Sequence, residues 1–520
     1  MSQAQYGWWV PAEENPPWPL RLKGWIAVVV GGALCVAGCA VGPNYRRPVV
    51  QVPTGFKEAA DWRRARPDPQ AALSSTWWLA YRDDALSHLV DRALKANQSI
   101  VVAEAAYRLA RATVTADTAK LYPTVTANLA LTHVAGGANV PVTGTTIARG
   151  GAINIYNANG AVSWQPDLWG QIRRQIESSK ESAQATDAQL AGERLSIVAS
   201  VAIDYFELRQ ADIDIDLLKQ QQKIDAVLLD ATRAAYGQGT ASNNNVLTAQ
   251  DTLETVVADL QTTLTAREQD EHAIAVLIGV PPADFSLAPL PDYVFSTPPA
   301  PLVLPSQLLE RRPDVVVAER TAAAANAKIG VAVAAFYPAL NLSVEGGFES
   351  STLGQLFKLP SQFWTLGPSL SETIFDGGAR TAAVREARAT YDEDVATYRG
   401  TVLTAFQDVE NSLSSYNHLQ QQARAFADIQ DRNQQLFSAQ HQAVLVGSAS
   451  GANELTQQLT LLQAEQNLKD TQSLLAQSSV TLVENLGGGW QSGDLKGVAA
   501  SGAPPAGASH PSAQAGVAPP

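Results

Sequence analysis

The sequence repeats itself, and this internal duplication limits the possible folds more than any other feature. Three landmarks recur in the same order, two at one constant offset and one at a slightly longer offset: Ala235–Ser242 with Ala443–Ser450, Ile278-Gly279 with Leu486-Gly487, and Tyr122-Pro123 with Tyr337-Pro338. A repeated sequence predicts a repeated structural unit. We therefore expect two tandem copies, residues 77–280 and 306–489, joined by a Pro-rich linker at 281–305.

Each copy begins with a predicted helix, over 85–120 in the first copy and 306–335 in the second. Both helices run into Tyr-Pro, and proline ends a helix because it lacks an amide hydrogen and clashes with the preceding turn. Alternating apolar and polar residues follow, which predicts two strands per copy. The expected strands are about 121–134, 153–165, 338–349 and 362–373, with Gly- and Thr-rich loops at 136–151 and 350–361.

The longest uninterrupted pattern in each copy is helical. From Gln171 to Tyr236 the chain has no proline, and apolar residues recur at spacings of three and four. About 65 residues of helix would be about 100 Å long, which far exceeds the thickness of a bilayer. We therefore expect these helices to pack side by side in water, and Gly-containing turns to fold them into hairpins at 171–278 and 379–486.

The N-terminal 38 residues are expected to be a secretion signal. Arg21 and Lys23 precede an apolar run that is too short to span a bilayer comfortably. The run ends in Val36-Ala37-Gly38-Cys39, which resembles the lipobox of bacterial lipoproteins, and a short membrane anchor that happens to contain cysteine is the alternative. In the lipoprotein interpretation Cys39 carries acyl chains such as palmitate and starts a lipid-anchored segment, 39–76. Ala40 favours the outer membrane, because retained lipoproteins commonly have aspartate there.

Composition excludes several other classes. The formal net charge of -13 argues against a nucleic-acid partner, because binding phosphates needs a basic surface. Both cysteines, Cys35 and Cys39, lie in the N-terminal run, so they cannot form a disulfide framework for the rest of the chain. The six histidines show no metal-ligand spacing. The segment 490–520 is rich in Gly, Ala, Ser and Pro and is expected to be disordered.

No enzyme motif is found. The sequence lacks the P-loop, the zinc-protease and the nucleophile-elbow patterns, and the nearest match, Gly447–Gly451, has alanine where the nucleophile would stand. We predict no catalytic residues, no metal site and no cofactor.

The predicted strands allow two interpretations. Alternation with one apolar face is typical of an ordinary half-buried sheet, but strands of about ten residues in an exported chain also match the length that crosses an outer membrane. Four strands cannot close a barrel, and lipid does not tolerate an open sheet edge. A membrane-spanning sheet would therefore need several chains to pool their strands, whereas a lipid-tethered periplasmic scaffold would leave the strands unexplained.

Several motifs together resemble the TolC/OprM-like outer-membrane factors of tripartite efflux systems, in particular their lipoprotein branch. The residues that carry the resemblance are Cys39–Pro48, Trp77-Trp78, Pro166–Gly170 and Glu310–Asp314. The resemblance implies an α+β membrane protein in which a homotrimer forms a twelve-stranded outer-membrane β-barrel, continued by a long periplasmic α-helical barrel. It further implies a periplasmic adaptor protein that docks on the hairpin tips, an inner-membrane pump, and contact with outer-membrane lipid.

The same resemblance assigns roles to the residues at the two helix turns. The adaptor-docking tips would be Tyr236, Gly239, Thr240, Ser242, Gly447, Ser448 and Ser450. Relatives often constrict the closed tip with acidic residues, but here the matching places hold Asn245 and Asn453, with Glu454 adjacent. An amide constriction is the alternative to an acidic gate, and simple capping of helices and turns is the other interpretation. The expected function is a passive exit duct for small molecules such as drugs, with type I protein secretion or metal-ion efflux as alternatives.

Overall fold

The computed structural model describes residues 40–53, 55–58, 74–135, 152–299 and 310–495. The predicted signal sequence, Cys39, the loop at 136–151 and most of the predicted tail lie outside these residues. The chain divides into two compact units, which are described separately. Of the described residues, the first unit contains 40–45, 114–135, 152–179 and 325–390, and the second contains the remainder.

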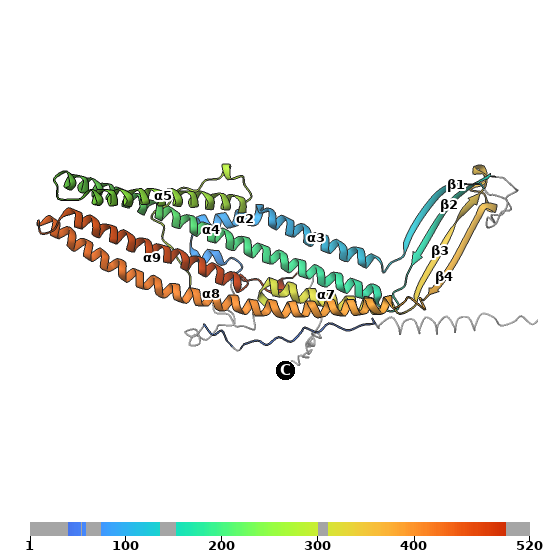
Figure 1. The fold of residues 1–520 in the computed structure, drawn as a ribbon. Coiled ribbons are helices and arrows are strands. Elements are labelled where there is room, and N and C mark those ends of the chain that lie inside the picture. Colours follow the sequence, from blue (N-terminus) through green and yellow to red (C-terminus); the bar gives the residue numbers. More distant parts are fainter. Residues whose placement is uncertain (1–39, 54, 59–73, 136–151, 300–309, 496–520) are drawn as a thin grey trace, which may run out of the picture. The chain divides into compact units, whose positions relative to one another are not determined.

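Long helices account for most of the described chain (Figure 1). Their bounds are α2 Asp84–Ala96, α3 Gln98–Ala119, α4 Gln171–Gly237, α5 Asn243–Leu277, α7 Pro313–Ala334, α8 Ala379–Leu445 and α9 Gly451–Asn485. Short 3-10 helices are η2 Trp77–Tyr81, η3 Pro282–Asp284, η4 Leu353–Gln355, η5 Leu359–Ser361 and η6 Ser492–Asp494. Within the described residues, no helix combines the length and apolar character needed to cross a membrane.

The first unit contains one antiparallel sheet with the strand order β1-β2-β3-β4 (Figure 1). The strands are β1 Thr124–Ala135, β2 Ala152–Trp164, β3 Ala339–Ser350 and β4 Gln362–Ser371. Each is within three residues of the span expected from the alternating pattern. Strands β2 and β3 pair across the duplication, with Val162 opposite Val344, so the two copies contribute two neighbouring strands each to one sheet.

The two faces of the sheet differ in polarity because successive side chains alternate between them. The register places most of the large apolar side chains on one face, where many of them are exposed in the single chain: Val125, Leu129, Leu131, Trp164, Val344, Trp364, Leu366 and Leu370. On this face the polar side chains His133, Asn154 and Gln362 lie at the strand ends next to the loops. The opposite face carries most of the polar side chains, including Asn128, Asn157, Asn159, Asn341, Glu345, Glu349 and Thr365.

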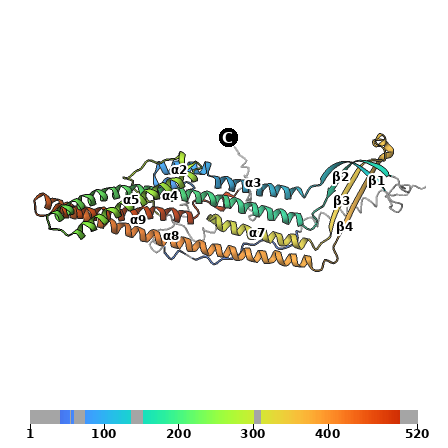
Figure 2. The same cartoon turned by 45° about the horizontal axis from the view of Figure 1, so that its top comes forward.

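The largest core lies in the second unit. Aromatic residues of η2 and α4 pack together there, and the ring centroids of Tyr81 and Phe206 are 5.3 Å apart. The Tyr81 hydroxyl is 2.6 Å from the Ser479 hydroxyl of α9, which satisfies two buried polar groups. A second view shows α5 and α9 beside α4 and α8, respectively (Figure 2). The core thus joins the two helices of the first hairpin, α4 and α5, to α9 of the second.

The single helix predicted over 85–120 is wrong, because the structure breaks it into α2 and α3 at Asn97. The Asn97 side chain accepts hydrogen bonds from the amides of Ser99 and Ile100, at 2.9 and 3.2 Å, and thereby caps α3. Its Nδ2 donates to the carbonyl oxygen of Leu277 at the end of α5 (2.9 Å). Asparagine side chains compete with the helical main chain in this way.

The second copy has the same break, built with different residues. Residues 310–311 are helical, Arg312 interrupts the single helix predicted over 306–335, and α7 begins at Pro313; the predicted start at 306 lies outside the described residues. Proline at the first helical position explains the start of α7. The Arg312 Nη1 donates to the carbonyl oxygen of Asn485 at the end of α9 (3.3 Å), as Asn97 does to Leu277 in the first copy.

Two glycines allow the ends of α5 and α9 to approach these helix breaks closely. Gly279 and Gly487 follow the ends of α5 and α9 with φ of +74° and +91°. A Cβ atom on Gly279 would collide with the carbonyl oxygen of Ala96, and one on Gly487 with that of Arg311. Only glycine tolerates both the left-handed conformation and the close backbone approach.

Replacing either glycine by alanine is expected to destabilise the chain by about 2 kcal/mol or more, since the new Cβ meets main-chain atoms in a left-handed residue. The measurement is the midpoint of thermal unfolding of purified G279A and G487A. Gly400→Ala is the matched control, because Gly400 lies within α8 with no atom within 4 Å of a new Cβ. Unfolding midpoints of G279A and G487A equal to that of the control would contradict the proposed closure.

Candidate functional site at the helix turns

The two helix turns have the same hydrogen-bonding pattern. The α4–α5 turn places Gly239 at φ +71°, and the α8–α9 turn places Gly447 at φ +76°. The amides of Thr240 and Ser448 each donate to the carbonyl oxygen five residues earlier, at 2.9 Å in both turns. The matching landmarks in the sequence therefore correspond to matching turns.

All seven predicted tip residues are exposed in the single chain, and several have a structural role as well. The hydroxyls of Thr240 and Ser448 donate to the carbonyl oxygens of Ala235 and Ala443, each at 3.0 Å. The side chains of Ser242 and Ser450 cap α5 and α9 by accepting from main-chain amides. Tyr236 is 50% exposed and leaves an aromatic ring on the surface beside the first turn.

The three predicted gate residues lie in the first turns of α5 and α9. Asn245 and Asn453 are exposed, and each donates its main-chain amide to a capping serine at 3.3 Å. Glu454 differs, because its Oε1 lies 2.6 Å from Nδ1 of His441 on α8. The carboxylate thus links the two helices of the second hairpin.

Sequence reasoning did not single out His441. At the offset of the repeat its counterpart is Arg233, which pairs with Asp230 within α4 at 3.3 Å rather than reaching α5. The second turn has a side-chain link across its hairpin, and the first turn has a different arrangement. Comparing the two copies position by position would have found this difference.

Half-buried carboxylates of α4 and α5 are a second feature that sequence reasoning missed. Burial, together with the nearby carboxylates of Glu207 and Asp270, raises the pKa of Asp204 to about 7. Burial and the charge of Glu207 raise the pKa of Asp270 to about 6. In a helical pattern such residues resemble a solvated face, and only the packing shows their burial.

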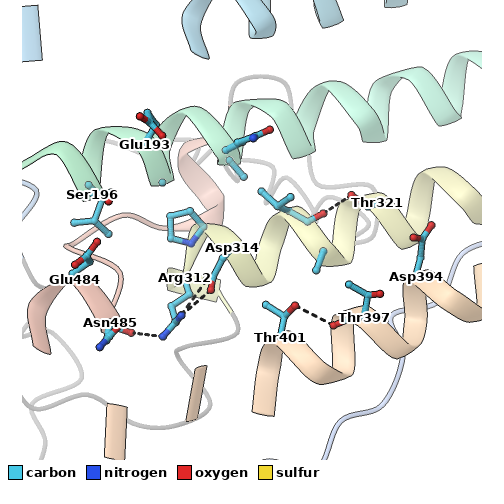
Figure 3. A pocket seen from close by; sticks show the side chains of 17 residues that line it. Glu193, Ser196, Arg312, Asp314, Thr321, Asp394, Thr397, Thr401, Glu484 and Asn485 are labelled. Carbon is cyan, nitrogen blue, oxygen red and sulfur yellow. Dashed lines mark hydrogen bonds and ion pairs between the residues drawn. The ribbon is translucent and has the colours of Figure 1, made fainter. Parts of the chain in front are cut away.

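A cavity of about 640 Å³ lies in the second unit between α4, α7, α8 and the end of α9 (Figure 3). Arg312 at its wall pairs with Asp314 at 2.7 Å and with Asp408 at 3.2 Å. The Arg312 guanidinium is therefore satisfied by structural ion pairs. Within the described residues, no group of three or more His, Cys, Asp or Glu side chains could hold a metal ion.

Comparison with known proteins identifies the family. The model of the outer membrane efflux protein family matches residues 89–280 and 304–488, one stretch in each copy. The chain belongs to the outer membrane efflux protein family, a family of efflux ducts rather than enzymes. This confirms the resemblance to the TolC/OprM-like factors and the role of the chain as an outer-membrane channel subunit of an efflux system.

Individual relatives agree with this assignment. The chain is 28% identical over 460 residues to the probable efflux pump outer membrane protein TtgC of Pseudomonas putida, covering 88% of this chain and 94% of that protein. It is 29% identical over 486 residues to the pyoverdine export outer membrane protein OpmQ of Pseudomonas aeruginosa, covering 91% and 98%.

Solved structures share the fold. The outer-membrane channel OprN matches with a TM-score of 0.77 at 28% identity, covering 87% of this chain and all of that one. The open state of the MtrE outer membrane channel of Neisseria gonorrhoeae matches with a TM-score of 0.75 at 27% identity, covering 87% and 99%.

The raised pKa of Asp204 predicts a pH-dependent effect of its replacement. Between about pH 4 and pH 7 the folded chain holds a proton that the unfolded chain releases, so this group's contribution to stability falls as the pH rises. Asp204→Asn should therefore raise the unfolding temperature more at pH 8 than at pH 5. Asp284→Asn in the exposed linker is the control, and an equal change at both pH values for D204N would contradict the argument.

Proposed function

We propose that this chain forms the passive outer-membrane exit duct of a tripartite efflux pump for small molecules such as drugs. The observation that carries the proposal is the four-stranded sheet, which has an exposed apolar face and a polar face. Strands of 10 to 13 residues suit an outer-membrane bilayer crossed at a tilt. The apolar face would contact lipid, and the polar face would line the duct.

The proposed assembly is a homotrimer. In the sheet of one chain, β1 and β4 are the edge strands, and each pairs on one side only. Lipid does not tolerate such edges, so β4 of one copy is proposed to pair with β1 of the next. Three copies would give a closed barrel of twelve strands, and the long hairpins would form the periplasmic helical barrel.

Lipid anchoring at Cys39 is part of the proposal. The residues that follow it are held firmly in the first unit, since the Val41 amide donates to the carbonyl oxygen of Trp169 at 3.1 Å. The Arg174 guanidinium donates to the carbonyl oxygen of Val41 (3.1 Å) and to the Asn44 side chain (2.8 Å). A lipid on Cys39 would therefore be attached close to a well-packed part of this unit.

Opening is proposed to occur at the helix turns. A periplasmic adaptor that binds the tips more tightly in the open arrangement would shift the population toward it, and an inner-membrane pump would supply the energy. Asn245, Asn453 and Glu454 would constrict the closed end. A role as a tethered scaffold is disfavoured, because it gives no reason for the exposed apolar face. The cargo alternatives, proteins or metal ions, would use the same duct.

Surface labelling tests whether the sheet crosses the outer membrane. Lys358 is exposed in the loop between β3 and β4, whereas Asp284 lies in the linker that the proposal places in the periplasm. A membrane-impermeant maleimide should label Lys358→Cys in intact cells, and Asp284→Cys only after the outer membrane is permeabilised. If K358C is labelled only after permeabilisation and not in intact cells, the result would contradict the proposal.

Conductance in planar bilayers tests the gate. The double variant Asn453→Ala/Glu454→Ala removes the amide and the carboxylate at the second turn, so it should conduct more than the unmodified channel. The control Asp431→Ala/Gln434→Ala removes the same two chemical groups from exposed positions of α8 away from the turn. Unchanged conductance of N453A/E454A would remove both residues from the gate.

A further inference from the structure

Glu345 and Glu349 are the formally charged residues of the four strands, since neither Asp, Lys nor Arg occurs in β1 to β4. Both are on β3, four positions apart, and the alternation of side chains places them on the polar face of the sheet. The polar face therefore carries negative charge without any basic residue among the strands to offset it.

Both carboxylates are held by neutral partners. Asn157 lies opposite Glu349 and donates from Nδ2 to Oε2 at 3.1 Å. Asn159 lies one pair further along β2 and donates from Nδ2 to Oε1 of Glu345. Amide donors orient a carboxylate without neutralising it, and in the described part of the chain neither glutamate forms an ion pair.

Strand β3 itself has no side chain between the two carboxylates. Gly347 lies between them on the same face of β3, opposite Asn159. A Cβ atom at this position would collide with the carbonyl oxygen of Ala158 and lie 2.6 Å from the Asn159 Cα. Strand β3 thus presents its two glutamates with no third side chain between them.

We propose that Glu345 and Glu349 make the outer-membrane section of the duct selective for cations, so that cationic and neutral solutes pass more readily than anionic ones. This inference rests on the proposed function, in which the polar face lines the duct. In a trimer, two carboxylates per chain would place six around one lumen. Rings of acidic side chains select cations because they raise the local concentration of cations and lower that of anions.

The helix turns give a reason to place this selectivity in the sheet. The proposed constriction offers the uncharged side chains Asn245 and Asn453, and the carboxylate of Glu454 is engaged by His441. The strand carboxylates have only amide partners. Compared with Glu454 at the turn, they are therefore better able to act on an ion in the lumen.

The test is the ratio of potassium to chloride permeability, obtained from reversal potentials of purified channels in planar bilayers under a KCl gradient. A unit charge about 10 Å away in water changes the local ion concentration about twofold, so a ratio of about 2 or more is expected at low salt. In 1 M salt the Debye length is about 3 Å, and the ratio should fall toward one.

The variant Glu345→Gln/Glu349→Gln keeps the size and the hydrogen-bonding capacity of both side chains but removes their charge. Its ratio should be close to one while conductance persists. The control Asp284→Asn/Asp292→Asn removes two carboxylates from exposed linker positions and should keep the unmodified ratio.

Four results would overturn the inference. An unmodified channel that prefers chloride contradicts it, and so does a double variant that conducts with an unchanged ratio. If E345Q/E349Q forms no channels, the single variant Glu349→Gln tests the inference, because position 349 is exposed and tolerates change. The ratio of potassium to chloride permeability of E349Q must still fall, and an unchanged ratio would contradict the inference. A chain that forms no channel at all would refute the proposed function itself, and the inference with it.

Discussion

Main-chain polar groups need hydrogen-bond partners wherever water is absent. This requirement limits how the sheet of this chain can be placed in a membrane. Four antiparallel strands satisfy one another internally but leave one side of β1 and one side of β4 open. The sheet also exposes an apolar face beside those edges, and such a face is unfavourable in water. Both features would be resolved together if copies of the chain completed the sheet in lipid, as the proposed assembly requires.

The two copies follow one template but differ in the residues that make its contacts. Both copies close the base of their hairpin by the same contact, a side chain at a helix break that donates to the last turn of the returning helix. The first copy uses the neutral Asn97, and the second uses Arg312, which also binds Asp314 and Asp408. The two turns differ as well. His441 contacts Glu454 across the second hairpin, whereas Arg233, which matches His441 in the repeat, pairs with Asp230 on its own helix.

Patterns of local origin were predictable, and contacts between distant segments were not. The strands follow from alternation and the long helices from the absence of proline, because both signals lie in consecutive residues. The break at Asn97 was missed, since asparagine ends a helix only when its side chain finds partners, and one of these is 180 residues away. Likewise the burial of Asp204 and Asp270 depends on how α4 and α5 pack, which their spacing does not reveal.

The sequence by itself determined the duplicated architecture, the places of the turns and the family, because repeats and motifs are properties of order along the chain. The prediction of lipidation at Cys39 also rests on the sequence alone. The tertiary structure alone decided which residues meet: the pairing of β2 with β3, the contacts of Asn157 and Asn159 with Glu349 and Glu345, and the link between His441 and Glu454. Register and packing set these contacts, and both depend on segments that the sequence keeps apart.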